Sequence, residues 1–536
     1  MNEMKTQETT AVPPVGTNVP AAAYPAYTPA VPVKMSPEEE KKRVSHFCYF
    51  SIGSLIYAFF YTLCLYKNPS GITYPFFIGG TLFYFFLYLK KSGITAKKDS
   101  IFYITALLLL GISTFCTDDG SLLFMNKLGI FVLMFSFILH NLYQDGDWNL
   151  SKYLSVICKT VLGSVGAIGQ PFTDWGLYLK QRKEAKGKNA SKGRYVFFGL
   201  LLSIPLLIVV VALLETADMV FASFVNNFFI NIRIPENLFG ICFTLVFAFF
   251  ASYCIIAYLT RNKMEEKTVN KRTGEPILAI TVTAVLSVIY VIFSGIQINY
   301  LFLGNGSLPD NYTYSAYARQ GFFQLLFVCL INLTLVLICL GRFKENRLLK
   351  ILLTLISLCT YVMIASSAMR MIIYIKYYYL TFLRIFVLWA LAVIFLLMTG
   401  VLVSIYREHF PLFKYSMAVV TVLYIGLSFS HPDYIIARLN TAYMMTGKES
   451  GFFETENGYS DCYYLKNLSA DAAPALLSID NPELYDELQE LEESGNEAWW
   501  YSEYIANMKE KSEKMNLRTF NLSRYRAELM IRQNKY

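Results

Sequence analysis

About eleven long apolar stretches, separated by polar loops, constrain this chain more than any other feature of its sequence. An α-helix rises about 1.5 Å per residue, so about 20 apolar residues cross a hydrocarbon core of about 30 Å. Residues 195–214, 238–260 and 322–341 meet this length. Since unpaired backbone amides are costly in lipid, such stretches cross as helices. The sequence therefore predicts an all-α fold, a polytopic transmembrane helical bundle.

Composition supports this class and excludes several others. The chain is 55% hydrophobic and 16% charged, against about 25% charged in soluble proteins. Nine of its ten Cys lie inside apolar runs, where Cys behaves as a small hydrophobe, and only Cys462 lies in a polar region. A disulfide framework is therefore excluded. No Walker loop, dinucleotide fingerprint, nucleophile elbow or zinc motif is present, so we assign no catalytic residue, cofactor, metal or nucleic-acid partner.

The pattern divides the chain into three regions. Residues 1–45 form an N-terminal tail whose Pro- and Ala-rich part is expected to be disordered, 46–430 form the transmembrane helical domain, and 431–536 form a small, mostly helical, soluble C-terminal region. The predicted spans are 46–66, 72–89, 101–116, 122–142, 195–214, 238–260, 277–299, 322–341, 349–369, 384–405 and 415–430. The third and eleventh are short for a crossing, so ten or twelve spans remain possible.

Lys and Arg predict the orientation, because cationic side chains near span ends are retained in the cytoplasm. Cations cluster before the first span and after the second, fourth, sixth, eighth and tenth, as at Lys41 to Arg43 and Lys97 to Lys98. The alternate loops, including the one around Asp118 and Asp119, are poor in cations. We therefore expect a multi-pass protein of the cell membrane with a cytoplasmic N-terminus and an extracytoplasmic C-terminal region.

Residues 143–194 form a predicted cytoplasmic interfacial loop. Residues 150–175 are moderately apolar but contain lysines, glycines and a proline, which favours an amphipathic helix in the membrane interface. The basic stretch 180–194 is expected to lie against anionic lipids. A solvated loop that only sets the topology is an equal alternative.

Several short stretches resemble a known family. Residues 217–222 (Ala-Asp-Met-Val-Phe-Ala) match its Ala-Asp-Pro-Val-Phe-Ala except at Met219, and 314–322 (Tyr-Ser-Ala-Tyr-Ala-Arg-Gln-Gly-Phe) are similar to its Tyr-Ala-Glu-Tyr-Ala-Arg-x-Gly-Phe. Further landmarks are residues 377–384, 432–440, 468–477 and 521–524. This pattern is similar to the bacterial multi-pass membrane protein family catalogued as domain of unknown function 4153/4173. The resemblance implies a fold and a membrane location but no activity.

Charged residues in these stretches are expected to lie at the outer interface. Ionisable groups near hydrocarbon are costly unless they are paired, hydrated or facing a cavity, so we expect part of this set to line an outward-facing cavity that binds an anion. Lys376 stands where the family often has an acid, which puts any ion pair shared at that position in doubt. The alternative is a network of ion pairs that clamps loops onto helices. The candidate ligand-binding residues are Glu215, Asp218, Arg319, Arg370, Lys376, Arg384, Asp433 and Arg438.

Three functional classes remain open at this point. The preferred one is transport or handling of an anionic or lipid-linked envelope compound through the outward-facing charged cavity. The alternative is a non-enzymatic signalling or scaffold protein whose C-terminal region binds an envelope protein partner. An envelope enzyme is the third class. All three place the chain in the lipid bilayer, with anionic lipids at its basic cytoplasmic loops.

Overall fold

The computed structural model describes residues 37–146, 148–186, 237–261, 272–299, 321–407, 409–445, 464–477 and 499–533, with scattered residues between 199 and 223. These parts of the chain are helical and contain no strand. Gly274 and Phe343 form one isolated bridge. Most of the predicted disordered tail, residues 1–36, lies outside the described residues.

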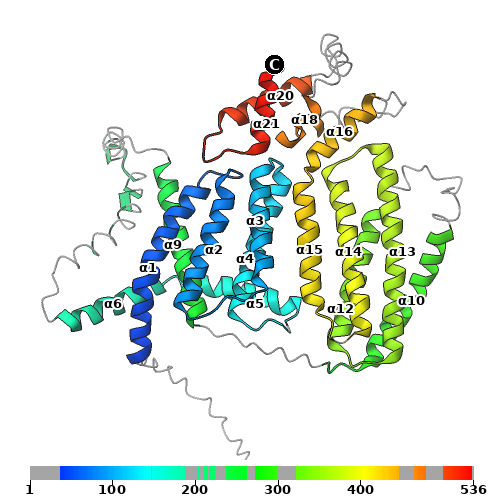
Figure 1. Ribbon diagram of the computed structural model, residues 1–536, viewed down its shortest axis with the longest axis horizontal. Helices are drawn as coiled ribbons and strands as arrows, with labels where there is room; N and C mark the ends of the chain where they lie inside the picture. The colour runs from blue at the N-terminus through cyan, green and yellow to red at the C-terminus, as the bar shows by residue number, and fades with distance from the viewer. Residues whose placement is uncertain are drawn as a thin grey trace, which may run out of the picture.

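The long helices run roughly parallel to one another (Figure 1). They are α1 (Pro37–Leu65), α2 (Thr73–Lys91), α3 (Ser100–Cys116), α4 (Gly120–Leu142), α9 (Leu238–Arg261), α10 (Pro276–Gln297), α12 (Phe322–Arg342), α13 (Arg347–Tyr378), α14 (Phe382–Tyr406) and α15 (Leu412–Phe429). Among the described residues, eight of these are long and apolar enough to cross a membrane: α1, α4, α9, α10 and α12 to α15. This is a multi-pass membrane protein.

The other two helices of this set run between the same two ends. α2 has 19 residues and α3 has 17, in agreement with the short third span expected from the sequence. The predicted span 195–214 lies largely outside the described residues. However, α6 lies at the end where α1 begins, whereas α9 begins at the opposite end (Figure 1). The chain therefore changes ends between these two helices.

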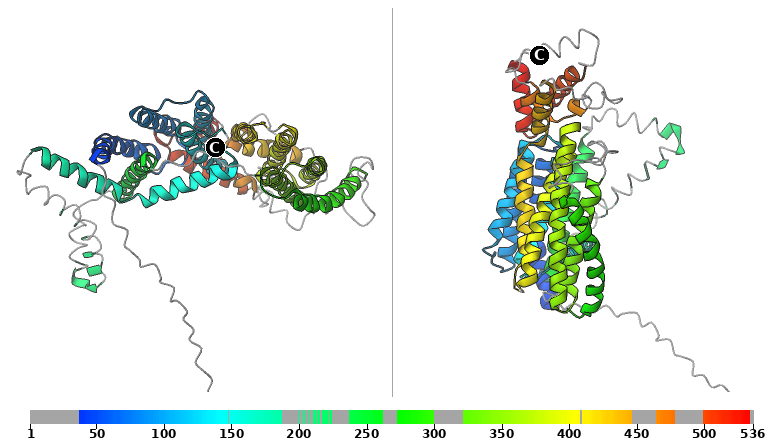
Figure 2. Two further views of the ribbon diagram at one scale, coloured as in Figure 1. Left: turned by 90° about the horizontal axis from the view of Figure 1, so that it is seen from below. Right: turned by 90° about the vertical axis from the view of Figure 1, so that its right-hand side faces the viewer.

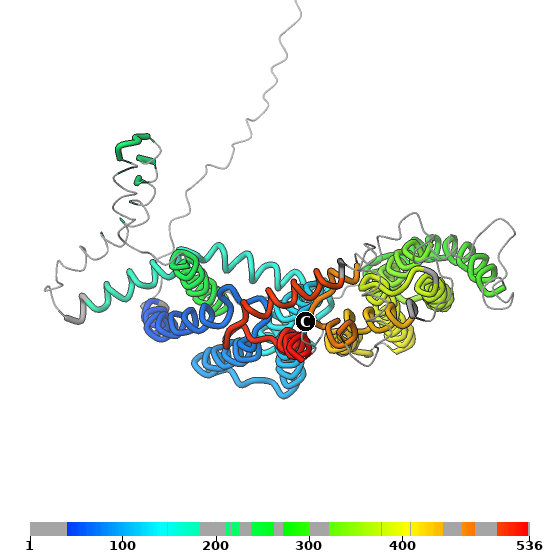
Figure 3. The backbone as a smooth tube through the Cα atoms, turned by 90° about the horizontal axis from the view of Figure 1, so that it is seen from above, coloured from blue at the N-terminus to red at the C-terminus, as the bar shows by residue number. Residues whose placement is uncertain are grey.

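The helices form two groups that stand side by side (Figures 2 and 3). In the first group α1 packs on α2 and α9, and α3 packs on α4; in the second, α13 packs on α10, α12 and α14. α15 joins the groups by packing on both α3 and α14. Large apolar side chains such as Phe59, Phe83 and Leu63 remain exposed on the outer faces, as expected where lipid replaces water.

The C-terminal elements form a cap on one end of the bundle, which we call the cap end (Figure 1). The cap consists of α16 (Pro432–Met445), η2 (Ala470–Ala472), α18 (Ala473–Leu476), α20 (Trp499–Glu513) and α21 (Leu522–Gln533). Its own apolar core surrounds Tyr504 and Ile436. The C-terminal region is thus helical where it is described.

The cap is fastened to loops of both helix groups. In the first group, the Arg518 guanidinium donates to the carbonyl of Tyr66 at 2.5 Å, and the Asn521 amide donates to the carbonyls of Ser70 and Thr117 at 3.0 and 2.8 Å. In the second group, the Asn440 side chain exchanges two hydrogen bonds with the backbone of Leu380. The cap therefore bridges the two groups.

At the opposite end lie the cation-rich loops, and two helices cross beneath the bundle (Figures 1 and 2). These are α5 (Leu150–Gly166) and α6 (Gln170–Lys186). The predicted interfacial segment is therefore two helices, not one, and it breaks at residues 167–169, just before Pro171. We call this the cation-rich end.

Candidate functional site

Four buried aspartates meet where the cap covers the bundle. Asp118 and Asp119 lie in the α3–α4 loop, Asp433 lies in the first turn of α16, and Asp471 lies in η2. Each is at most 6% exposed. Buried carboxylates are costly unless they are paired, hydrogen-bonded or protonated, so their partners determine what this aspartate cluster can do.

Local backbone requirements place these side chains. The Asp119 Oδ1 atom accepts from the amides of Ser121 at 2.8 Å and Leu122 at 3.4 Å, which makes Asp119 the N-cap of α4. The Asp433 Oδ2 atom accepts from the amide of Ser469 at 2.9 Å, which joins α16 to η2. Short loops between apolar helices therefore hold the carboxylates together.

Two of the four aspartates have compensating partners. Asp118 binds the Arg524 guanidinium at 2.6 Å and the Lys511 ammonium at 3.0 Å. Asp471 accepts from the Thr117 hydroxyl and faces the His431 imidazole at 3.3 Å. Burial alone would raise the pKa of Asp471, but its hydrogen bonds, led by the one from His431, hold that pKa below its ordinary value.

The other two aspartates have no counter-ion in the part of the chain that the structure describes. Among the described residues, neither Asp119 nor Asp433 forms an ion pair, and the Asp119 Oδ2 atom has no hydrogen-bond partner. Burial and then the Asp433 charge raise the pKa of Asp119 to about 7, and burial raises the pKa of Asp433. Two like charges in one buried site disfavour ionisation of both.

A polar network continues below the cluster, between α3, α4 and α15. The Asn126 Oδ1 atom accepts from the hydroxyls of Tyr424 at 2.6 Å and Ser428 at 2.7 Å, and its amide donates to Ser113 at 3.3 Å. Asn126 lies about 10 Å below Asp119 along α4. The next buried side chains of α4, from Ile130 to Phe135, are apolar, and buried polar groups return only at Ser136, His140 and Asn141, so an apolar layer separates the two polar regions of this helix.

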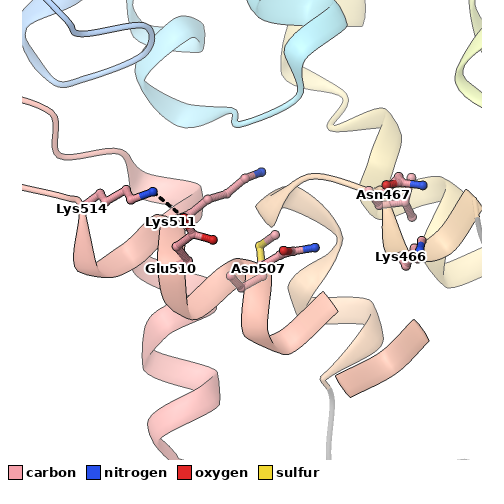
Figure 4. Close-up of a pocket in the computed structure, with 8 residues that line it drawn as sticks. Lys466, Asn467, Asn507, Glu510, Lys511 and Lys514 are labelled. Carbon is pink, nitrogen blue, oxygen red and sulfur yellow. Dashed lines mark hydrogen bonds and ion pairs between the residues drawn. The ribbon is translucent and has the colours of Figure 1, made fainter. Parts of the chain in front are cut away.

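A cavity of about 370 Å³ adjoins the aspartate cluster on the cap (Figure 4). It opens between α20 and the segment 466–468, and three lysines from these two elements surround it. We call it the lysine pocket. Its lining residues are Lys466, Asn467, Leu468, Asn507, Met508, Glu510, Lys511 and Lys514. Lys511 belongs both to this pocket and to the ion pair with Asp118.

The structure separates most of the residues proposed from the sequence. Asp433 lies in the aspartate cluster. Arg370, on α13, is buried and donates to the Gln297 Oε1 atom at 3.2 Å. Arg384 donates to the carbonyls of Tyr378 and Tyr379 and lies over the Tyr374 ring, so it clamps the α13–α14 loop.

The other candidates are exposed or lie outside the described residues. Lys376 and Arg438 are exposed, and Arg438 donates to the Tyr434 hydroxyl at 3.2 Å. Asp218 is exposed too, and its carboxylate accepts from the two amides of Val220 and Phe221 as a helix cap. Glu215 and Arg319 are not described. The described candidates therefore do not line one cavity.

Sequence reasoning missed Asp118, Asp119, Asp471 and Lys511 as site residues. The signal was the pair Asp118-Asp119 in a loop of three residues between two apolar helices, where a carboxylate has little room to reach water. From the sequence, the loop with this pair indicated only how the chain is oriented across the membrane. Lys511 carries no such signal, because nothing in its neighbourhood predicts that α20 packs against the α3–α4 loop.

A second set of buried ion pairs lies at the cation-rich end. Asp174, on α6, binds Arg43 of α1 at 2.7 Å and Arg261 of α9 at 2.6 Å, and it accepts from the Tyr253 hydroxyl at 2.8 Å. Close to the C-terminal end of α4, His140 pairs with Asp145 of the following loop at 2.8 Å. No group of three or more His, Cys, Asp or Glu among the described residues could hold a metal ion.

A family model for a domain of unknown function, DUF4153, matches residues 104–479. The chain belongs to the DUF4153 family. This confirms the resemblance seen in the sequence. The match begins well before the first motif, residues 217–222, and it contains all four aspartates of the cluster, whereas Lys511 and Arg524 lie beyond its end. No curated protein and no solved structure matches the chain.

Proposed function

We propose that this DUF4153 protein binds and handles an anionic or lipid-linked envelope compound at its cap end. The lysine pocket carries the proposal. Three lysines line it, and the amides of Asn467 and Asn507 add hydrogen-bond donors. The three ammonium groups form ion pairs with Glu503, Asp118 and Glu510, so a bound anion would share them with these carboxylates. Phosphate and carboxylate groups are the ligands that such a set of donors recognises.

The position of the pocket favours a compound of the envelope. The cap rests on the ends of the membrane helices (Figure 1), so the pocket lies near the level at which lipid headgroups meet water. A headgroup phosphate and a free anion present the same chemistry there. Since the described polar network ends at Asn126, the geometry favours binding or handling at this surface over passage through the α3–α4–α15 interface.

The proposed test measures anion binding to the full-length protein in nanodiscs. Inorganic sulfate and a short-chain phosphatidic acid are the probes, and the first represents a free anion while the second represents a lipid-linked one. Lys514→Gln and Lys466→Gln should each weaken binding about tenfold or more, since a charge-assisted hydrogen bond contributes about 1.5–3 kcal/mol. Stronger binding of the phosphatidic acid would identify a lipid-linked ligand.

The matched control is Lys509→Gln. Lys509 lies on the same helix, α20, but is exposed and does not line the pocket, so its replacement should leave the affinity unchanged. Equal losses in all three variants would show that only the net charge matters, and absence of binding at low ionic strength would remove the proposal.

The eight residues chosen from the sequence remain a second proposed ligand-binding set. One contact supports part of it. Gly321 has a φ of +103°, and a Cβ atom there would lie 2.8 Å from an Arg370 nitrogen. Gly321, at the start of α12, therefore lies against the Arg370 guanidinium.

The alternative, a scaffold whose C-terminal region binds an envelope protein, has one observation in its favour. The cap contacts loops of both helix groups, so a partner bound to the cap would influence both. Binding of such a partner without any binding of sulfate or phosphatidic acid would favour this alternative.

A further inference from the structure

Asp119 occupies an unusual position in the aspartate cluster. It is 5% exposed; one carboxylate oxygen caps α4, and the other has no hydrogen-bond partner among the described residues. A buried acceptor without a donor is costly. A proton on this oxygen would remove the charge and turn the acceptor into a donor.

The charged and titratable groups around Asp119 and its cluster come from several elements. Asp433 of α16, Asp471 of η2, Tyr424 of α15 and Tyr464 of the segment 464–468 lie within the electrostatic reach of Asp119. The other aspartates of the cluster are surrounded by His431 beside α16, Tyr504 and Lys511 on α20, and Arg524 and Arg526 on α21. Lys511 and Arg524 both bind Asp118, and His431 binds Asp471. These three cations therefore pair with the other two aspartates, Asp118 and Asp471.

We propose that Asp119 is a proton-binding site, and that its proton is coupled to anion binding in the lysine pocket through the Asp118–Lys511 ion pair. The coupling rests on the proposed function, whereas the proton site does not. The raised pKa of Asp119, caused by burial and by Asp433, places its titration near neutral pH.

The sign of the coupling follows from the shared lysine. Protonation of Asp119 removes one negative charge beside Asp118, so the ammonium of Lys511 attracts an anion in the pocket more strongly. Anions should therefore bind more tightly below pH 7 than above it. By linkage, a bound anion strengthens proton binding at Asp119 by the same factor.

The first experiment tests the proton site without any anion. An acid whose pKa is raised by folding loses stability as pH rises from the unfolded pKa to the folded one. For Asp119 this window extends from about pH 4 to about pH 7. The unfolding temperature of the wild type should fall across it. Asp119→Asn should show a smaller decline, because of the two aspartates with a raised pKa only Asp433 remains. Asn is itself a good N-cap, so the variant is expected to fold.

Two variants make this result specific. Asp433→Asn removes the neighbouring charge and should move the window to lower pH. In His431→Gln the decline should remain, because the His431 pKa is raised above 6.5 by its hydrogen bond to Asp471, and its contribution is lost only at higher pH. A decline of unchanged size in Asp119→Asn, or one that disappears in His431→Gln alone, would overturn the proton site.

The second experiment measures sulfate affinity between pH 5.5 and 8.5, a range over which sulfate keeps its charge. The wild type should bind sulfate about tenfold more weakly at the high end, within the usual range of coupling between two sites. Asp119→Asn should bind tightly at every pH. A flat profile in the wild type would overturn the coupling. Absence of sulfate binding at any pH would overturn the proposed function, and the unfolding experiment would still decide the proton site.

Discussion

At the scale of single residues, buried Arg370 and half-buried Arg384 stabilise joints between helices of the second group. Arg370 meets Gln297, which also accepts from the Ser366 hydroxyl at 2.6 Å, so one amide oxygen joins α10 to two turns of α13. Arg384 bonds two loop carbonyls beside Tyr379, whose φ is +62°. These contacts fit the alternative that the sequence left open, in which charged residues hold loops and helices together.

Replacement of Arg370 by alanine distinguishes a clamp from a ligand site. If Arg370 is mainly a clamp, Arg370→Ala should lower the free energy of unfolding by about 1–3 kcal/mol, because a buried hydrogen-bonding group is lost. Chemical unfolding in mixed micelles measures this. Lys376→Ala, an exposed change on the same helix, should stay within about 0.5 kcal/mol. Unchanged stability in Arg370→Ala, together with weaker anion binding, would support the ligand role instead.

At the scale of elements, the helix ends follow local sequence signals. Asn149 and Asn346 cap α5 and α13, and Pro276 lies in the first turn of α10. α13 continues to Tyr378, nine residues beyond the predicted end of its apolar span at 369. The apolar pattern predicted the membrane-spanning part of this helix. It could not predict the extension, because side chains of the cap that are distant in sequence cover it.

The attachment of α6 to the bundle depends on Asp174. Asp174→Asn would remove the carboxylate that Arg43 and Arg261 share, and the side chains of these two arginines are only 16% and 24% exposed. We expect a loss of about 3 kcal/mol in unfolding free energy, and earlier proteolysis of α6. Glu40→Gln is the control at the same joint: its partner Lys180 is 61% exposed, so the loss should be below about 1 kcal/mol.

Attachment of the cap requires a glycine in the α1–α2 loop. A Cβ atom on Gly71 would lie 2.4 Å from the Arg518 carbonyl oxygen and 2.7 Å from the Thr519 Cα atom, and backbone atoms cannot easily move away. Gly71→Ala should therefore cost about 1–3 kcal/mol and speed hydrogen exchange in α21. Gly79→Ala, on α2 with no neighbour within 4 Å, should be neutral or stabilising. Equal exchange rates in both variants would contradict this docking.

At the scale of the whole molecule, hydrophobic patterning predicted the all-α membrane bundle and most of its helices, because crossing lipid requires long apolar helices. It could not predict the aspartate cluster or the lysine pocket. Asp118 and Arg524 are 406 residues apart in the chain, and their meeting depends on how the cap folds over the bundle. Local pattern contains no information on such distant contacts, whereas the Asp433 landmark could be recognised from its family motif.

The cationic loops and the cap lie at opposite ends of the molecule, which allows the predicted orientation to be tested. The described parts of the cation clusters lie at the cation-rich end, and the cap lies at the other (Figure 1). Because cytoplasmic loops retain Lys and Arg, we expect the cap to be extracytoplasmic. In a variant lacking the ten native cysteines, Glu513→Cys on α20 should react with an impermeant maleimide in intact cells. Ser151→Cys on α5 should react only after lysis, and the reverse pattern would place the lysine pocket and Asp119 in the cytoplasm.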